Sequence, residues 1–462
     1  MTKGLLIVVV SGIIFTTVFR AQTPTPLPAA KETQPKPAVP LEPITAIIEA
    51  FQSHTVVALG NVEFRGNEQS HAFQLSLIRA PRFAATVNDI LVEFGDARYQ
   101  EVIDQFLRGE QIPDESLRSV WQNTTQVEYE WDLPIYEEFF RAVRAVNATL
   151  PRSRQLRVLL GDPPIDWDKV QTREDLRKAM GDRDGYAADV LRREVLAKGR
   201  RALVIYGSQH LIRKNPVPGA VDEWARGIVG RMEKENLTRF FTILPETRRD
   251  LRALQPDVAS WPAPSLAILR GTALGSAIWD SGPQGRPVRM EDQVDAILYL
   301  GPPSSMTSSK LARALCADRS YMDMRLRRLA LVAPPSGAAF GPAEQLKDYC
   351  AHPEGYSEIP DREPAITELI RKTLQDAAQG KVNPDSIAPE SRERLIAFLQ
   401  RDGPRYLGAA GALGSLTLLA DTESGGKHVR RYRSVFASGL RIIWTVGLST
   451  SGAIVSLDAQ PE

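Results

Sequence analysis

The chain has 462 residues, and its 57 lysines and arginines nearly balance its 56 aspartates and glutamates, which leaves a net charge of +1. This balance provides no bulk field that would attract nucleic acid or an anionic membrane surface, so we expect no general binding to either. Hydrophobic residues at 43% are typical of a globular protein with a buried core, and the length indicates two or three domains.

Residues 1–21 have the pattern of a secretory signal peptide. A single lysine at position 3 precedes an apolar run over residues 4–19, which is shorter than the ~20 residues of a membrane-spanning helix. Residues 22–43 are rich in proline, threonine and alanine and predict an extended linker. We therefore expect an exported protein, periplasmic or extracellular. The alternative to cleavage is a retained N-terminal anchor, which would be the chain's only contact with a membrane.

From residue 44 onward, apolar strands alternate with helices. The predicted strands are continuous apolar runs at 55–60, 89–94, 156–161, 202–207 and 239–244, followed by shorter ones at 265–269 and 296–300. The predicted helices between them include 67–79, 99–108, 135–147, 173–198 and 221–234. This alternation predicts an α/β domain over residues 44–380, with a mostly parallel sheet flanked by helices.

A second, smaller domain is predicted over residues 390–462. Its boundary is the stretch 380–392, which is rich in turn-forming residues. A helix at 393–400 then precedes four strands at 415–419, 429–436, 441–448 and 453–457, which are joined by short turns. This order predicts an α+β domain with an antiparallel meander.

Four predicted strands of the α/β domain end in polar residues that could do chemistry. Asn61 and Glu63 follow the first strand, Glu93 lies near the end of the second, and Asp162 and His210 follow two later strands. Open α/β sheets bind ligands outside the carboxyl ends of their strands. We therefore expect Glu63, Glu93, Asp162 and His210 to share one cleft that binds a small-molecule ligand or substrate.

The residue types leave several roles open. A carboxylate at Glu93, inside an apolar strand, indicates a metal ligand, a catalytic base or an internal ion pair. His210 suits metal binding or proton transfer. Asp162 is interpreted as a ligand, as a group that orients His210, or as a turn cap. Glu63 and Glu68, after the first strand, could bind a hard cation near Glu93 or remain solvated.

Other motifs narrow the possibilities. No G-x-S-x-G elbow, P-loop or G-x-G-x-x-G following a strand occurs, which disfavours a serine hydrolase and a nucleotide-phosphate binder. The two cysteines, Cys316 and Cys350, form a disulfide or remain buried free thiols. Neither has a second cysteine or a suitably spaced histidine beside it, which disfavours a zinc site there.

The strand-end motifs, in their order, resemble the Tiki / erythromycin-esterase-like superfamily, which includes ChaN-like haem-uptake proteins. The stretches that carry the resemblance lie within about residues 44–330 and read VALGNVEF, NDILVEFG, LRVLLGDPPIDW, ALVIYGSQHL and DAILYLGPPSS. The resemblance implies a hydrolase scaffold with Glu93 and His210 as catalytic residues, and a divalent metal bound by Glu63, Glu93 and His210, or haem, as cofactor. Asn61, Glu63, Glu68 and Asp162 would be binding residues. The C-terminal domain resembles NTF2- or cystatin-like modules.

One of the two G-x-x-H phrases of that superfamily is altered here. The phrase Gly207–His210 is intact, whereas relatives read G-E-x-H where this chain has Gly60, Asn61, Val62 and Glu63. A carboxylate in place of the histidine favours a harder ion and normally stays ionised. We therefore expect a hydrolase-type scaffold with an altered site. The alternatives are a non-catalytic module that binds haem or another hydrophobic small molecule, and an interaction protein whose C-terminal meander binds a partner.

Overall fold

The structure is a computed structural model that describes residues 35–61, 66–215, 217, 220–247, 251–279, 286–332, 341–424 and 427–462. The predicted signal peptide and most of the predicted linker lie outside these residues. Residues Lys36–Glu462 belong to one compact unit. Within the described part of the chain, no helix is both long enough and apolar enough to cross a bilayer.

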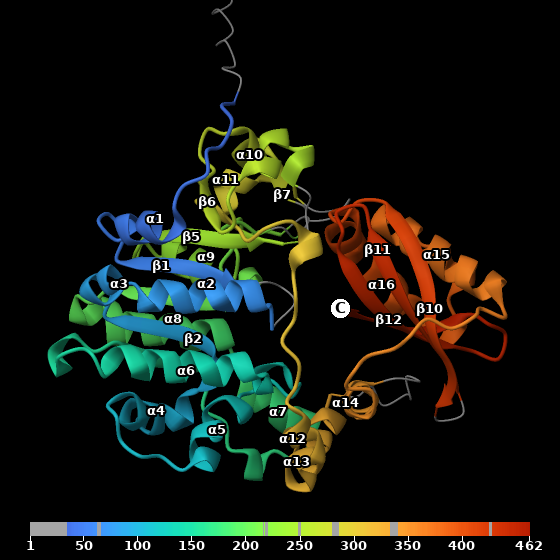
Figure 1. The fold of residues 1–462 in the computed structure, drawn as a ribbon, viewed down its shortest axis with the longest axis horizontal. Coiled ribbons are helices and arrows are strands. Elements are labelled where there is room, and N and C mark those ends of the chain that lie inside the picture. The colour runs from blue at the N-terminus through green and yellow to red at the C-terminus, as the bar shows by residue number, and fades with distance from the viewer. Residues whose placement is uncertain are drawn as a thin grey trace, which may run out of the picture. The chain divides into compact units, whose positions relative to one another are not determined.

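The larger sheet confirms the predicted mostly parallel architecture (Figure 1). It has seven strands in the order β3-β2-β4-β1-β5-β9-β6, and only β6 runs antiparallel to its neighbour. The strands are β1 Val56–Asn61, β2 Asp89–Asp96, β3 Arg157–Asp162, β4 Ala202–Gly207, β5 Phe240–Glu246, β6 Ser265–Ile268 and β9 Ala296–Tyr299. Because the four strands that end in polar residues are neighbours in this sheet, their carboxyl ends lie along the same edge.

Helices cover both faces of this sheet, and each face has its own apolar core. Side chains of β1 alternate between the two cores, with Val57 and Leu59 in one and Val56 and Ala58 in the other, as expected for a strand buried on both faces. The first core contains residues of α1 Pro43–Ala50, α2 Glu68–Arg79, α3 Pro81–Thr86, α4 Gln100–Leu107, α5 Asp114–Gln122, α6 Pro134–Asn147 and α7 Arg173–Met180. The second contains residues of α8 Arg183–Val190, α9 Ile228–Lys234, α10 Ala273–Ser276 and α11 Met290–Gln293.

The helical stretch predicted over residues 173–198 is interrupted, because the chain breaks between α7 and α8. Gly181 has a positive φ of 50°, which ends α7. The Asp182 side chain then caps α8 by accepting a hydrogen bond of 2.9 Å from the Gly185 amide. This break places Arg183 and Asp184 in the first turn of α8.

The smaller sheet confirms the predicted antiparallel meander. Its strands are β10 Leu413–Ser424, β11 Lys427–Phe436, β12 Arg441–Leu448 and β13 Ile454–Pro461, each paired with the next. Two helices, α15 Pro364–Ala378 and α16 Arg392–Gly403, share a third apolar core with these strands. Since α15 ends before residue 380, the core of this C-terminal part includes a helix from before the boundary that the sequence predicts.

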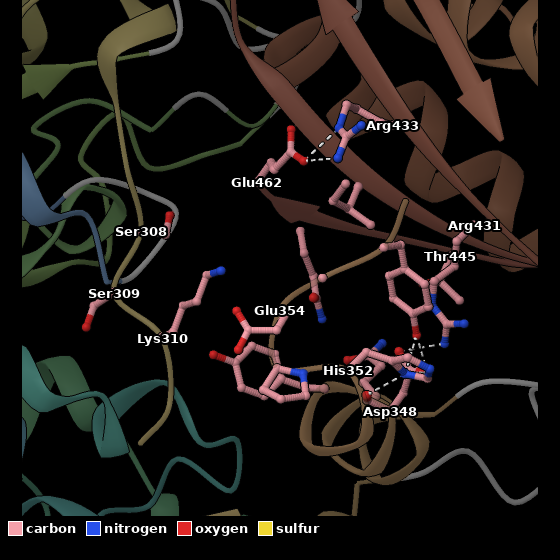
Figure 2. Close-up of a pocket in the computed structure, with 17 residues that line it drawn as sticks. Ser308, Ser309, Lys310, Asp348, His352, Glu354, Arg431, Arg433, Thr445 and Glu462 are labelled. Carbon is pink, nitrogen blue, oxygen red and sulfur yellow. Dashed lines mark hydrogen bonds and ion pairs between the residues drawn. The ribbon is translucent and has the colours of Figure 1, made fainter. Parts of the chain in front are cut away.

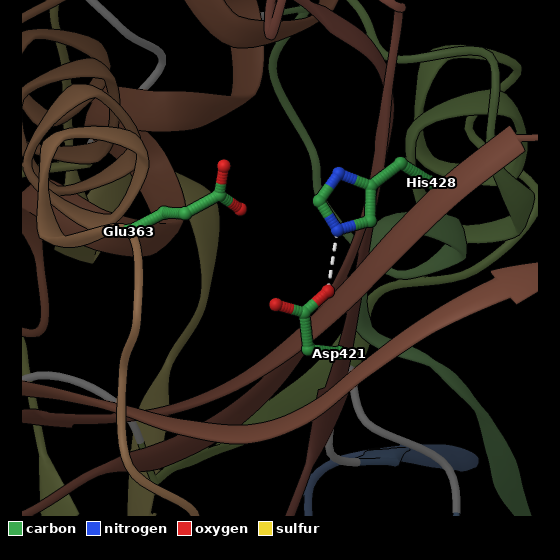
Figure 3. Close-up of side chains that lie close together, drawn as sticks. All are labelled: Glu363, Asp421 and His428. Carbon is green, nitrogen blue, oxygen red and sulfur yellow. Dashed lines mark hydrogen bonds and ion pairs between the residues drawn. The ribbon is translucent and has the colours of Figure 1, made fainter.

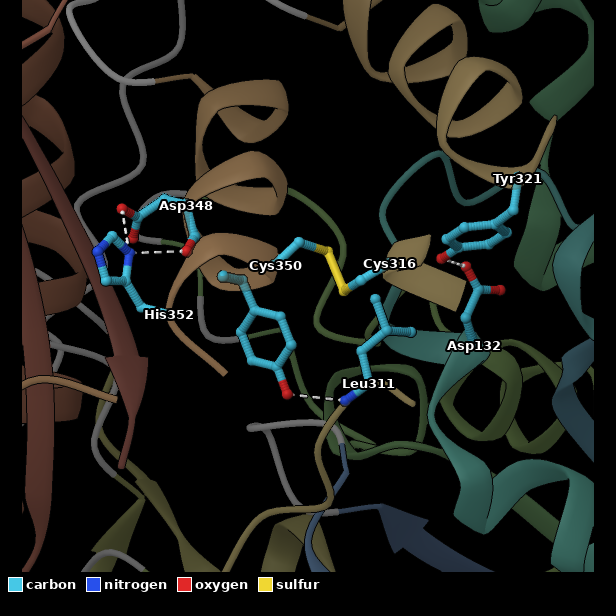
Figure 4. The surroundings of a disulfide bond; sticks show 8 residues. Asp132, Leu311, Cys316, Tyr321, Asp348, Cys350 and His352 are labelled. Carbon is cyan, nitrogen blue, oxygen red and sulfur yellow. Dashed lines mark hydrogen bonds and ion pairs between the residues drawn. A yellow bond between two sulfur atoms is a disulfide. The ribbon is translucent and has the colours of Figure 1, made fainter. Parts of the chain in front are cut away.

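Cys316 and Cys350 are bonded to each other, which confirms the disulfide alternative (Figure 4). The bond joins α12 Arg313–Ala317 to α14 Pro342–Ala351, with 5.4 Å between the two Cα atoms. The intervening helix, α13 Arg319–Ala330, is fixed by a buried ion pair of 2.6 Å between Arg325 and Asp132. The disulfide therefore fixes the end of α14, where several polar side chains gather.

Candidate functional site

The strand register brings three of the predicted site residues together at one edge of the larger sheet. Asn61 on β1 pairs with Gly207 on β4, and Val92 on β2 pairs with Ile205 on β4. Glu93 therefore lies beside the end of β4, where His210 follows in a short 3-10 turn. Glu93, Asp162 and His210 thus lie at one edge of the sheet, but Glu93 and Asp162 are buried, and Glu63, the fourth residue expected in the cleft, lies outside the described residues.

Glu93 is fully buried, and its two carboxylate oxygens have different partners. Oε2 accepts a hydrogen bond of 2.8 Å from the Gly207 amide, and Oε1 lies 3.2 Å from Nη2 of Arg183. A Cβ atom at Gly207 would lie 3.3 Å from Glu93 Oε2, so glycine allows the strand to approach the carboxylate closely. Of the predicted roles, the structure shows the internal ion pair.

Arg183 joins Glu93 to Asp162. Its Nε donates a hydrogen bond of 2.9 Å to Asp162 Oδ1, and Asp162 also accepts from the amide and the hydroxyl of Thr125 at 2.5 and 2.8 Å. Burial raises the pKa of Asp162, although Arg183 and Thr125 oppose this shift. For Arg183, burial alone would lower the pKa, but the two carboxylates outweigh it and the pKa is raised. The guanidinium thus compensates two buried carboxylates.

His210 lies between two carboxylates at the border of the buried cluster. Its Nδ1 is 2.6 Å from Asp184 Oδ1, and its Nε2 is 3.6 Å from Glu93 Oε1. About a quarter of the imidazole side chain (24%) remains exposed, so it can reach solvent. Burial alone would lower its pKa, but the hydrogen bond to Asp184 and the charge of Glu93 outweigh burial, and the pKa of His210 is raised.

The other predicted binding residues are placed differently. Asn61 is buried, its amide oxygen accepts from Gln74 at 2.8 Å, and its backbone oxygen accepts from Ser208 at 2.7 Å. Its side-chain nitrogen has no hydrogen-bond partner in the described part of the chain. Glu68 is exposed at the start of α2, and its carboxylate accepts a hydrogen bond of 2.6 Å from the Thr307 hydroxyl, which is not part of the Glu93–His210 cluster.

A cleft of about 960 Å³ opens beside His210 and Asp184. Its walls come from the chain that follows His210 and from α9, and they include Ile212, Ala225 and Lys234. This volume lies at the upper end of the range typical of small-molecule sites. The arrangement is thus an oriented imidazole at the wall of a large cleft, backed by a buried and charge-compensated cluster.

The sequence prediction missed Arg183 and Asp184, which supply the cation of the cluster and the partner of His210. The sequence does contain a local signal for this placement. Gly181, which can end a helix, is followed by Asp182, which can cap the next one, so that Arg183 and Asp184 begin a new helix. Asp162 was considered as the residue that orients His210. The structure gives that contact to Asp184 and uses Asp162 to bind Arg183 and Thr125.

The described residues do not favour a divalent metal between Glu93 and His210. A guanidinium already lies 3.2 Å from Glu93, and it would repel a divalent cation bound to the same carboxylate. Of the two ring nitrogens of His210, Nδ1 is bound to Asp184 at 2.6 Å, so Nε2, 3.6 Å from Glu93 Oε1, is the nitrogen that could act as an axial ligand of haem or accept a proton.

Elsewhere in the described residues, one group has the residue types of a metal site (Figure 3). Atoms of Glu363, Asp421 and His428 lie within 4.8 Å of one another. The buried guanidinium of Arg430 forms ion pairs with both carboxylates, at 2.8 Å to Asp421. His428 also contacts Asp421 directly. We therefore interpret this group as an ion-pair cluster.

Comparisons with known proteins concern the fold alone. No protein-family model matches the chain, and no curated protein is significantly similar to it in sequence. The solved structure of a succinoglycan biosynthesis protein is 11% identical, with 57% of this chain and 94% of that chain covered and a TM-score of 0.41. Erythromycin esterase EreC is 13% identical, with coverages of 58% and 94% and a TM-score of 0.39.

A third solved structure, of haem-bound ChaN from Campylobacter jejuni, is 14% identical, with coverages of 44% and 85% and a TM-score of 0.29. Sequence identities and TM-scores this low support no conclusion about the activity of this chain. The solved structures similar to this chain thus include an erythromycin esterase and a ChaN protein.

Proposed function

We propose that this protein is a hydrolase of small-molecule esters whose proton-transferring group is His210. The observation that carries the proposal is the position of the imidazole, held by Asp184 at 2.6 Å and facing Glu93 at 3.6 Å, at the wall of the cleft of about 960 Å³. A histidine oriented by a carboxylate and in contact with a cleft is the arrangement of a general base.

The steps follow from the geometry. When His210 is neutral, its Nδ1–H donates to Asp184, so the lone pair is on Nε2. Nε2 removes a proton from a water molecule, and the water oxygen forms a bond to the ester carbonyl carbon. The imidazolium then gives this proton to the alkoxide as the carbon–oxygen bond of the ester breaks. Asp184 and the buried Glu93 stabilise the imidazolium by their charge. Glu93 is a positioning residue because it is fully buried.

The altered first motif is expected to weaken this activity. Asn61 is an amide whose nitrogen has no hydrogen-bond partner among the described residues, and it stands where relatives have an acid. Its oxygen is occupied by Gln74. The charged group that relatives carry at this position is therefore absent, so we propose slow turnover without a metal.

A second candidate function is a binding module that keeps the cleft and has lost the chemistry. The ion pairs of Arg183 favour it, because they satisfy Glu93 and Asp162 without a substrate or a metal. The two candidates share one cleft and differ in turnover. A ligand would then bind beside His210 and leave unchanged.

The test is a panel of p-nitrophenyl esters of increasing acyl length, with and without EDTA. We expect His210→Gln to lower kcat/KM by about 10²–10⁴, because that is the usual contribution of a general base. His71→Gln is the matched control, since His71 is a buried histidine 3.0 Å from the carboxylate of Glu138 and lies outside this site. Equal turnover by the two variants would refute the role of His210. A wild type without turnover that still binds esters would favour the second candidate.

We further propose that the protein is exported. The disulfide between Cys316 and Cys350 supports this, because such bonds persist in oxidising compartments. Cell fractionation with N-terminal sequencing of the mature chain would test it. Cleavage near residue 21 and recovery outside the cytoplasm are the expected results.

A further inference from the structure

A second pocket lies apart from the cleft beside His210. It has a volume of about 220 Å³ and is lined by residues 308–310, by the end of α14 and the loop after it, and by one face of β11–β13 (Figure 2). None of its lining residues belongs to the cleft. The volume is below the ~300 Å³ at which typical drug-sized sites begin, so it suits a ligand of about one sugar ring.

The aromatic wall of this pocket is held in place by several bonds. Cys350, next to Tyr349, is tied by the disulfide, and the Tyr349 hydroxyl accepts a hydrogen bond of 2.8 Å from the Leu311 amide (Figure 4). The Tyr356 hydroxyl donates to Asp348 at 2.5 Å. A wall fixed in this way needs little ordering when a ligand binds.

The opposite wall is polar and charged. The buried Arg431 lies 2.8 Å from Asp348, with its guanidinium 4.9 Å from the centre of the Tyr356 ring. Arg433 is paired with Glu462, whose oxygen accepts from its Nε at 2.6 Å. These two arginines therefore have their counter-charges within the pocket.

One cation that lines the pocket, Lys310, has no counter-charge among the described residues. Lys310 forms no hydrogen bond or ion pair with a residue that the structure describes, and Figure 2 shows its side chain directed toward the pocket. Glu354, the remaining acid of the lining, is paired with Arg313, which does not line the pocket. The hydroxyls of Ser308, Ser309 and Thr445 also line it. The pocket thus combines one unmatched positive charge, neutral hydroxyl groups and two tyrosines.

We propose that this pocket is a second ligand site for a small hydroxylated ring that carries one negative charge, as a carboxylate or a phosphate. Lys310 binds the anionic group, because a charge-assisted hydrogen bond to an ammonium is about twice as strong as a neutral one. The neutral hydroxyl side chains bind the ligand's own hydroxyl groups, and the tyrosines pack against its ring.

The test is calorimetric titration of the full chain with glucuronate, glucose 6-phosphate and glucose. We expect saturable binding of at least one acid, at least tenfold tighter than that of glucose, and the acid that binds identifies the anionic group. Lys310→Met should weaken it at least tenfold and leave the melting temperature of the free protein unchanged. Lys372→Met, at an exposed lysine on α15 outside the pocket, should leave binding unchanged.

Absence of saturable binding of both acids up to about 10 mM would overturn the proposal, since that corresponds to less than 3 kcal/mol of binding free energy. Equal binding of glucose and the acids, or unchanged binding by Lys310→Met, would also overturn it. The His210→Gln variant should bind these acids like the wild type. This result separates the pocket from the ester-hydrolysing site, so that either proposal can fail alone.

Discussion

Arg183 is the residue on which the buried cluster depends most. It contacts both Glu93 and Asp162, through Nη2 at 3.2 Å and Nε at 2.9 Å. We predict that Arg183→Gln, which keeps a polar side chain but removes the charge, destabilises the protein by about 3 kcal/mol at pH 8. Breaking a buried ion pair usually costs about 3–5 kcal/mol, because a charge is left without compensation.

The low end of that range follows from the partners that remain. Asp162 keeps both hydrogen bonds from Thr125, and Glu93 keeps the Gly207 amide. The carboxylates themselves are only 0% and 1% exposed, so water compensates little of the lost charge. The side chain of Arg183 is 17% exposed, which makes its interactions only weakly screened.

The loss should depend on pH, and its sign follows from the protonation of the carboxylates. Burial already raises the pKa of Asp162, and loss of the guanidinium that opposes this shift raises it further above that in the unfolded chain. A carboxyl group with a raised pKa binds a proton more tightly in the folded state, so its destabilising effect is full at high pH and shrinks as the pH falls. We therefore expect the loss to fall to about 1 kcal/mol at pH 5 as protons neutralise the carboxylates.

The assay is urea unfolding of wild type and variant at pH 8 and pH 5, followed by tryptophan fluorescence. Arg192→Gln is the matched control, because Arg192 also pairs with two carboxylates, Asp189 at 2.6 Å and Glu235 at 3.2 Å, but is 44% exposed. Loss of these exposed ion pairs in Arg192→Gln should lower the free energy of unfolding by less than about 0.5 kcal/mol. Equal losses for the two variants, or a loss at pH 5 as large as at pH 8, would refute the reasoning.

Three further predictions concern the site. Asp184→Asn keeps an oxygen acceptor for Nδ1–H but removes the negative charge, which helps to raise the pKa of His210, so the rise of kcat/KM with pH should shift to lower pH; an unshifted profile contradicts this. Asn61→Glu combined with Glu63→His restores the relatives' phrase and should increase ester turnover, whereas strong wild-type turnover without improvement shows that the site is not weakened. Tyr206→Phe should raise the free energy of unfolding by about 1 kcal/mol, because the Tyr206 hydroxyl is buried without a hydrogen-bond partner. If urea unfolding shows that the variant is less stable, the Tyr206 hydroxyl has a hydrogen-bond partner and the prediction is wrong.

The helical and strand patterns of the sequence determined most of the fold. Continuous apolar runs such as the one in β4, predicted and found at 202–207, indicate a strand buried on both faces because every side chain meets a helix layer. The alternation of such runs with helices then predicts parallel neighbours. It also places Glu93 and His210 at one edge, because carboxyl ends of parallel strands coincide.

The tertiary structure decided which side chains meet at that edge. Glu93 and Arg183 are 90 residues apart, and their contact depends on β2 lying between β3 and β4 and on the helix break at Gly181. Local hydrophobic patterns set the period of each element but do not set the order of strands in a sheet. For the same reason, the sequence predicted a histidine and a carboxylate in one cleft, whereas only the folded chain could supply Asp184 as the partner of His210.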